Sequence, residues 1–159
     1  MGFRGFFIVA VFAPMAWAQP LEHAALPVQT AAGQHVEFQV EIADTPDKRH
    51  QGLMSRRALA GDAGMLFIFG EVKPVSMWME GTLLPLDMLF IDDNGRVVRI
   101  VPSTTPESTE LIPSGEPVRA VLEVNAGVCR RRGIRVGDQI DKSAIKAWWP
   151  TIPARQTPY

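Results

Sequence analysis

The chain has 159 residues, enough for one domain with a buried core and too few for two ordinary domains. Its 16 Lys and Arg residues nearly balance 17 Asp and Glu residues, which gives a formal net charge of -1 at pH 7. That balance argues against nucleic acid or an anionic membrane surface as a partner. The basic cluster Arg130, Arg131 and Arg132 is expected to be a solvated helix end.

Residues 1–18 are typical of a cleavable signal peptide. The apolar run FFIVAVFAPMA follows Arg4 and is too short to span a bilayer. Ala16 and Ala18 form the small-x-small pattern of a cleavage site, so we expect the mature chain to begin at Gln19. The prediction is export to a bacterial periplasm or secretion, with no membrane span after cleavage.

A linker or arm and then a strand are predicted at the start of the mature chain. Residues 19–33, QPLEHAALPVQTAAG, are expected to form a linker or a loosely docked arm. In VEFQVEIA, apolar and polar residues alternate from position 36 to position 42, which predicts a half-buried strand. This strand lies in a single β-rich domain predicted over residues 34–142, followed by a C-terminal tail over residues 143–159.

A short helix is predicted directly after this strand. Asp44 or Thr45 is suited to cap its start, and Pro46 is suited to its first turn. Gly52 lies about two turns further on and is expected to end the helix.

Several apolar strands follow the helix. GMLFIFG, residues 64–70, is apolar throughout and must be covered on both faces. VSMWM and LLPLDMLFID are the next two predicted strands. Asn94 and Gly95 favour a hairpin turn that returns the chain into RVVRIV.

From residue 102 onward the sequence predicts a long loop, then a strand, a short helix and a short final strand. Residues 102–117 form a long polar loop, and VRAVLEVNAG is a strand that leads to Asn125 as the cap of a second short helix, which Gly133 ends. IRVGDQI is a final short strand. The tail is expected to be irregular and to dock through Trp148 and Trp149.

So many apolar strands would expose their edges unless the sheet closed on itself. We therefore predict an α+β, mainly β fold. It is a small single domain with a curled mixed sheet or barrel-like core and two short helices.

The order of these motifs resembles the family known as domain of unknown function 192, including its secreted or periplasmic members. The matching stretches are VEIADTPDKRHQGLMSR, GMLFIF, VSMWMEGTLLPLDMLFIDDNGRVVRIV, VLEVNAG and GIRVGD, which together cover about residues 36–140. The resemblance implies a small β-rich, barrel-like domain and supplies no reaction. The family usually has Phe where Met77 stands and Lys-Asn where Glu80 and Gly81 stand.

Two acidic residues interrupt the apolar strands. Asp87 shares a strand face with Leu89 and Ile91, and Glu123 has the same setting beside Val121. A carboxylate in such a place must find hydrogen-bond donors or stay protonated. Arg56 is a candidate bidentate partner for either acid. The structural interpretation is a network that joins the helix to the sheet, and the functional one is acid/base work by paired carboxylates.

The methionines suggest a second chemistry. We predict Met77 and Met79 on one strand face, with Trp78 on the other, and thioethers suit Cu(I). Methionine also fills irregular cores, which is the interpretation we favour, so neither a metal nor another cofactor is expected. Cys129 has no histidine near it in sequence and is expected to be a small buried side chain rather than a nucleophile.

The function predicted from these residues is an exported cell-envelope binding or accessory module, with enzymatic activity less favoured. An apolar cleft would form from Trp78, from Phe67 or Phe69 and from Leu53 or Met54; Arg56, Asp87 and Glu123 would orient the ligand. The partner would be a small molecule or an envelope protein or peptide. The alternatives are a cell-envelope hydrolase that uses Asp87 and Glu123, and a methionine-based metal-handling protein.

Overall fold

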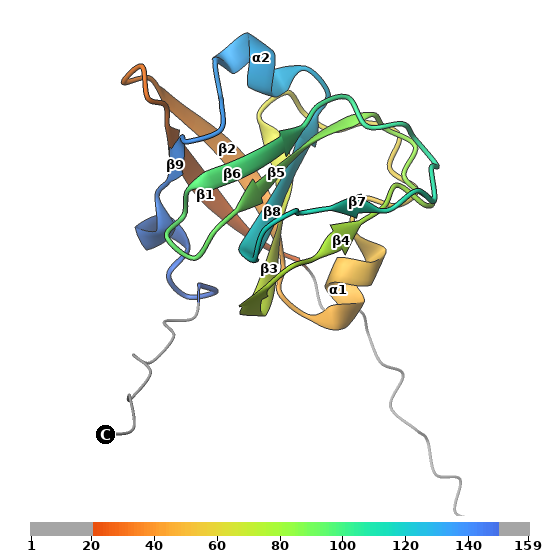
Figure 1. Cartoon of the computed structure of the whole chain (residues 1–159). Coiled ribbons are helices and arrows are strands. Elements are labelled where there is room, and N and C mark those ends of the chain that lie inside the picture. The colour runs from red at the N-terminus through yellow and green to blue at the C-terminus, as the bar shows by residue number, and fades with distance from the viewer. Residues whose placement is uncertain (1–20, 150–159) are drawn as a thin grey trace, which may run out of the picture.

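The computed structural model describes residues 21–149. In chain order its elements are β1 (Glu22–Gln29), β2 (His35–Ala43), α1 (Pro46–Gln51), β3 (Ala63–Lys73), β4 (Ser76–Met77), β5 (Leu86–Ile91), β6 (Val97–Val101), β7 (Ile112–Pro113), β8 (Val118–Asn125), α2 (Val128–Arg132), β9 (Gln139–Ile140) and the 3-10 turn η1 (Lys142–Ile145). Figure 1 shows α1 and α2 at opposite ends of the sheet. No helix in this part of the chain is long and apolar enough to cross a membrane.

The described residues form a mixed seven-stranded sheet in the order β6-β5-β8-β3-β2-β1-β9. The pair β2–β3 is parallel, with α1 in its connection, and the other neighbours in this order are antiparallel. The outermost strands are β6 and β9, and a bridge between Arg96, directly before β6, and Gln139 of β9 joins them. The sheet is therefore nearly closed into a barrel. This confirms the predicted fold class.

The stretch predicted to be a linker is in part a strand of the sheet. Residues 22–29 form β1, which pairs with β2 over its whole length, so the prediction of a linker or arm over residues 19–33 is wrong there. Leu26 and Val28 point into the core and are fully buried. Pro27 makes this stretch look unlike a strand in the sequence. A proline is tolerated here because β9 pairs only with Val28 and Gln29, so the edge of β1 is not paired with β9 at Pro27.

The tail also contributes to the body of the domain. The indole N–H of Trp148 donates to Glu22 at 3.0 Å, and Trp149 is buried in the core. Both indoles pack against the body of the domain, as predicted for this tail, although residues 150–159 lie outside the described part. The predicted signal peptide also lies outside it.

The two faces of the sheet carry separate apolar clusters. The alternating residues of β2 and the pair Leu89 and Ile91 of β5 lie in one cluster, inside the curled sheet. Leu86, Met88 and Phe90 of β5 lie in the other, beneath α1 and the small two-stranded sheet β4–β7. The predicted alternation of both strands is confirmed, and the second cluster forms the floor of the site described below.

An irregularity in β3 joins α1 to this second face. The register between β3 and β8 shifts after Ile68, which frees two carbonyl groups from the ladder. The guanidinium of Arg49 donates to the Ile68 carbonyl at 2.8 Å, and that of Arg119 donates to the Phe69 carbonyl at 3.1 Å. Arg119 is fully buried and also pairs with Asp93 at 2.8 Å. The two arginines thus satisfy carbonyl groups of the bulge; Arg49 ties the bulge to α1, and Arg119 ties it to Asp93 in the turn after β5.

The signals that predicted α1 are confirmed. The Thr45 hydroxyl accepts from the Lys48 amide at 3.3 Å, and Pro46 occupies the first turn. Gly52 ends the helix at a positive φ of 47°. An added Cβ at Gly52 would lie 3.3 Å from the ring of Phe67, so glycine also allows the end of α1 to approach the sheet closely.

Candidate functional site

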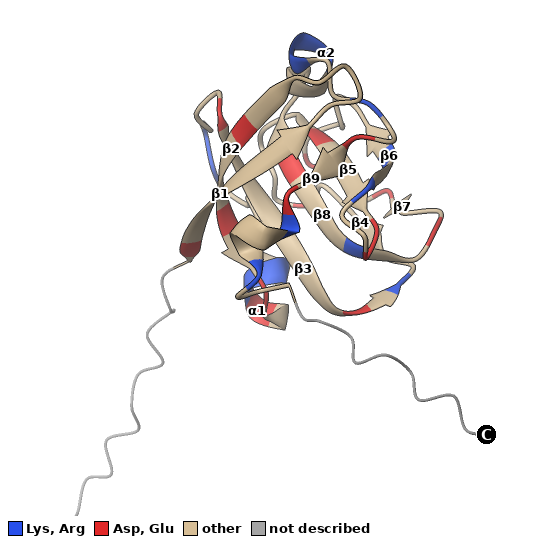
Figure 2. Cartoon of the chain, turned by 90° about the vertical axis from the view of Figure 1, so that its left-hand side faces the viewer, with Lys and Arg blue, Asp and Glu red and all other residues tan. Residues whose placement is uncertain are grey.

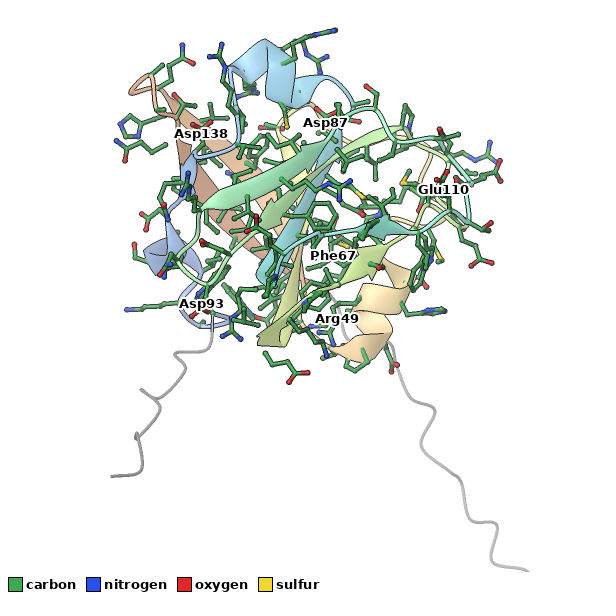
Figure 3. All side chains as sticks on the ribbon, viewed as in Figure 1. Arg49, Phe67, Asp87, Asp93, Glu110 and Asp138 are labelled. Carbon is green, nitrogen blue, oxygen red and sulfur yellow. The ribbon has the colours of Figure 1, made fainter. Side chains whose placement is uncertain are left out.

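A pocket of about 320 Å³ lies between α1 and β4, with the second face of the sheet as its floor. This volume is at the lower end of the range of small-molecule sites. Its lining consists of Pro46, Arg49, His50, Gln51, Gly52, Leu53, Met54, Phe67, Phe69, Ser76, Met77, Trp78, Glu80, Thr82 and Glu123. In Figure 3 Phe67 lies on the sheet and Arg49 lies toward α1.

Glu123 is the acidic group on the pocket floor. It is 4% exposed and lies directly between Met65 of β3 and Met88 of β5, both fully buried. Within residues 21–149 its carboxyl group has no hydrogen-bond partner, and its oxygens open onto the pocket instead of being sealed in the core. Burial between two thioethers raises the pKa of Glu123 to about 8, so the carboxyl is protonated at neutral pH.

Two turns are fastened to each other at the side of the pocket. The Ser55 amide donates to the Gly81 carbonyl at 2.9 Å, which ties the chain after α1 to the chain after β4. Gly81 has a φ of 67°, and an added Cβ would lie 3.2 Å from Met54. The Met79 amide donates to Ser108 at 2.9 Å and anchors the second turn to the long loop. The walls are therefore held in place by backbone hydrogen bonds of the protein itself.

The walls are mainly apolar and the rim carries balanced charge. The Trp78 side chain is 38% exposed at the rim. Arg49 lies over the ring of Phe69, at 5.4 Å from its centroid, and donates to backbone carbonyls. Its charge is opposed by Glu80 on the other wall. Glu123 is protonated, so Arg49 and Glu80 form a balanced pair of opposite charges in the lining.

Arg56 has a different partner from the ones considered above. It forms a two-armed ion pair with Glu41 of β2, and these hydrogen bonds lower the pKa of Glu41. On β3, Met65 lies between Glu41 of β2 and Glu123 of β8. The backbones of Glu41 and Glu123 are therefore two strand spacings, roughly 10 Å, apart. The predicted pairing of Arg56 with Asp87 or Glu123 is wrong, and Arg56 does not line the pocket.

Asp87 lies on the opposite face of the sheet from Glu123. Its two carboxylate oxygens accept the backbone N–H groups of Ser103 at 2.9 Å, Gly127 at 3.0 Å and Cys129 at 3.0 Å. Asp87 thereby caps the start of α2, where Asn125 was predicted to do so, and it fixes the loop after β6. Figure 3 shows it beneath α2, away from Phe67 and Arg49. The hypothesis that Asp87 and Glu123 act together as a catalytic pair is therefore wrong.

Most methionines of the domain lie near the pocket. Met65, Met79 and Met88 belong to the second apolar cluster, and Met77 packs against it. Met54 and Met77 line the pocket, whereas the Met79 sulfur accepts a hydrogen bond from Thr104 at 3.2 Å. The strand β4 ends at Met77, so the expectation that Met77 and Met79 share a strand face is wrong. Burial and the neighbouring Asp87 raise the pKa of the Cys129 thiol to about 12, which keeps it protonated and unreactive.

The structure brings Trp78, Met54 and Glu123 together, along with Leu53 and both Phe67 and Phe69. It leaves Arg56 and Asp87 outside the pocket. Arg49, His50 and Glu80 line the pocket and were not singled out from the sequence. The spacing of Pro46, Arg49 and His50 at i, i+3 and i+4 places them on one face of a helix, and this was the signal that could have found Arg49 and His50. Figure 2 shows basic residues of α1 and of α2 at opposite ends of the domain.

The sequence pattern of DUF192, described as an uncharacterised ACR, matches residues 28–142, most of the chain. The chain belongs to the DUF192 family. The search of curated proteins found no match.

Two solved structures resemble this DUF192 protein. One, from Sinorhizobium meliloti 1021, is described as a candidate transcription regulator; it is 45% identical with a TM-score of 0.77, over 79% of this chain and 97% of that chain. The other, a protein of unknown function from Novosphingobium aromaticivorans DSM 12444, is 31% identical with a TM-score of 0.74, over 86% of this chain and 99% of that chain. Both agree with the barrel-like fold.

Proposed function

We propose that this protein is an exported binding module whose pocket between α1 and β4 takes an uncharged ligand with an apolar body and a hydrogen-bonding head. The observation that carries the proposal is Glu123. It is a buried carboxyl group that faces a preformed pocket and has no hydrogen-bond partner within residues 21–149. Its oxygens open onto the pocket, so a bound ligand could supply the hydrogen bonds that the protein does not.

The chemistry of the floor selects the ligand class. A protonated carboxyl group offers one O–H donor and one C=O acceptor side by side. A carboxamide presents the complementary pair, an acceptor and an N–H donor, and would satisfy both. A carboxylate ligand would instead have to bury a charge beside apolar side chains, which is unfavourable. The rings of Phe67 and Trp78 then cover the apolar body of the ligand.

A hydrolase that uses two carboxylates is not supported, because both groups would have to face one scissile bond. Asp87 is on the other face of the sheet and is occupied by three backbone amides. Nor does the description of the Sinorhizobium relative lead us to propose DNA as the ligand. The described helices have 6 and 5 residues, and the whole chain has a net charge of -1.

Export remains part of the proposal on the basis of residues 1–18. The apolar run and the Ala16-x-Ala18 pattern support a cleavable signal. The strand β1 begins at Glu22, so cleavage before Gln19 would leave the described sheet intact.

Three molecules with the same ring and different head groups test the pocket: benzamide, benzoate and benzylamine. We expect benzamide, added at pH 6.5 to isotope-labelled protein, to cause saturable shifts of the backbone NMR signals of Phe67, Trp78 and Glu123. Benzoate should bind more weakly. Glu123→Leu should remove the preference for benzamide, whereas Glu116→Gln, a change of an exposed carboxyl group outside the pocket, should preserve it.

The absence of saturable shifts at the pocket with all three molecules would refute the proposal. So would an unchanged benzamide preference in Glu123→Leu.

A further inference from the structure

We propose that the ligand of the pocket is an extended peptide segment that pairs with the free edge of β4 and places one uncharged side chain beside Glu123. This inference deepens the proposed function and rests on it. It adds a backbone recognition mode, which depends on β4 rather than on the floor of the pocket.

The hydrogen-bond pattern of the β4–β7 pair shows which backbone groups are free. Met77 lies opposite Ile112, and Ser76 lies opposite Pro113, which has no N–H to donate. The Ser114 amide donates to the Val75 carbonyl at 2.8 Å, so Val75 and Ser114 form a hydrogen-bonded pair. Bonded and non-bonded pairs alternate in an antiparallel ladder, so the backbone groups of Ser76 point away from β7.

The pocket lies along this free edge. Ser76, Met77 and Trp78 all line it, although side chains of consecutive residues in a strand point to opposite faces. Three consecutive lining residues are expected when the edge of a strand, rather than one of its faces, borders a pocket. Within the described residues, the N–H and C=O of Trp78 also have no backbone partner. Figure 1 shows β4 between β7 and α1, in agreement with this arrangement.

The free edge offers four backbone groups, the N–H and C=O of Ser76 and of Trp78. These residues are two positions apart, which matches the spacing of an added strand. Two peptide residues, separated by one, can exchange hydrogen bonds with them. An extended peptide satisfies this pattern, whereas a compact small molecule has no such repeat.

The register also says which peptide side chain enters the pocket. The residue between the two bonded ones lies opposite Met77, and side chains of opposite residues share a face. Met77 packs against the apolar cluster that floors the pocket. The middle side chain of the peptide is therefore directed to the floor, where Glu123 offers its protonated carboxyl group. A glutamine at this position supplies the carboxamide inferred above.

The probe is the blocked peptide acetyl-Ala-Ala-Gln-Ala-Ala-amide, titrated into labelled protein at pH 6.5. We expect saturable shifts at Ser76, Trp78 and Glu123. Peptides that are N-methylated at the second or the fourth residue lose an N–H that faces β4 and should bind about tenfold more weakly. N-methylation of the glutamine, whose N–H faces away from β4, should leave affinity little changed.

Two variants test the same edge from the side of the protein. Ser76→Pro removes an N–H that β7 does not use, so it should weaken peptide binding about tenfold and leave the thermal unfolding temperature nearly unchanged. Ser76→Ala keeps the N–H and should bind like the wild type. If Ser76→Pro does not fold, the N-methylated peptides still decide the question.

Failure of this inference differs from failure of the proposed function. Benzamide binding without peptide binding would refute the peptide and leave the pocket as a small-molecule site. Equal weakening by all three N-methylations would also refute strand pairing. If neither benzamide nor the peptide binds, both proposals fail.

Discussion

Replacing Glu123 by Gln should stabilise the folded protein, and the gain should depend on pH. The folded protein holds Glu123 with a pKa of about 8, against 4.5 when the group is exposed. One pH unit of such a difference corresponds to about 1.36 kcal/mol. Burial of this acid therefore lowers the free energy of unfolding by about 4 kcal/mol at pH 8, where the folded group is half titrated. Glutamine has nearly the same shape and no charge to lose.

The sign of the pH dependence follows from proton release. Below pH 4.5 both the folded and the unfolded states carry the proton, so the carboxyl has no effect. Between pH 4.5 and about 8 the unfolded chain releases it and the folded protein keeps it, so wild-type stability from this group falls as pH rises. Above pH 8 both states release it and the difference levels off.

Urea denaturation at several pH values between 4.5 and 8.5 measures this difference. The stability of Glu123→Gln minus that of the wild type should be small at the acid end and grow toward pH 8. The matched variant Glu116→Gln, at an exposed site, should give a flat and small difference. A flat curve for Glu123→Gln, or a variant less stable than the wild type at pH 8, would show that folding does not raise the pKa of Glu123, and the argument for the pocket would fail.

Three further outcomes are expected. Asp87→Ala leaves three backbone N–H groups without an acceptor and should lower the free energy of unfolding by about 3–5 kcal/mol, with a smaller loss for Asp87→Asn; a variant that melts at or above the wild-type temperature would contradict the structural role. Arg56→Ala should cost only about 1 kcal/mol in an unfolding titration, because the pair with Glu41 is partly exposed; a loss as large as that of Asp87→Ala would contradict this. N-terminal sequencing of the exported protein should begin at Gln19, and an intact Met1 would refute cleavage.

The alternation of apolar residues was a strong predictor of the fold. It placed β2, whose burial alternates, whereas continuous apolar runs placed β3, β5 and β8, which are buried on both faces over most of their length. The strand β1 lacks that regularity, since Pro27 and two alanines replace the larger apolar residues. Its place in the sheet depends on pairing with β2, which is a tertiary effect that local pattern does not report.

The candidate site was harder to predict for a geometric reason. The sequence shows that Asp87 and Glu123 interrupt apolar strands, but the faces they occupy depend on register. Asp87 lies opposite Val124, one residue after Glu123, and this single step sends the two carboxyl groups to opposite sides of the sheet. The partner of Arg56 depended in the same way on β2–β3 pairing, which sequence spacing does not determine.

The pairing of β1 with β9 has a consequence for the order of folding. The first described strand, β1, pairs along one edge with β9, which is the last. The bridge between Arg96 and Gln139 closes the sheet beside this pair. Contacts between residues so distant in sequence form slowly, because a long loop must close before they gain anything. The barrel therefore stays open until the segment that holds Gln139 and Ile140 is available to pair with β1. A chain truncated before Gln139 should behave as an open sheet with two unprotected edges, prone to pair with other chains.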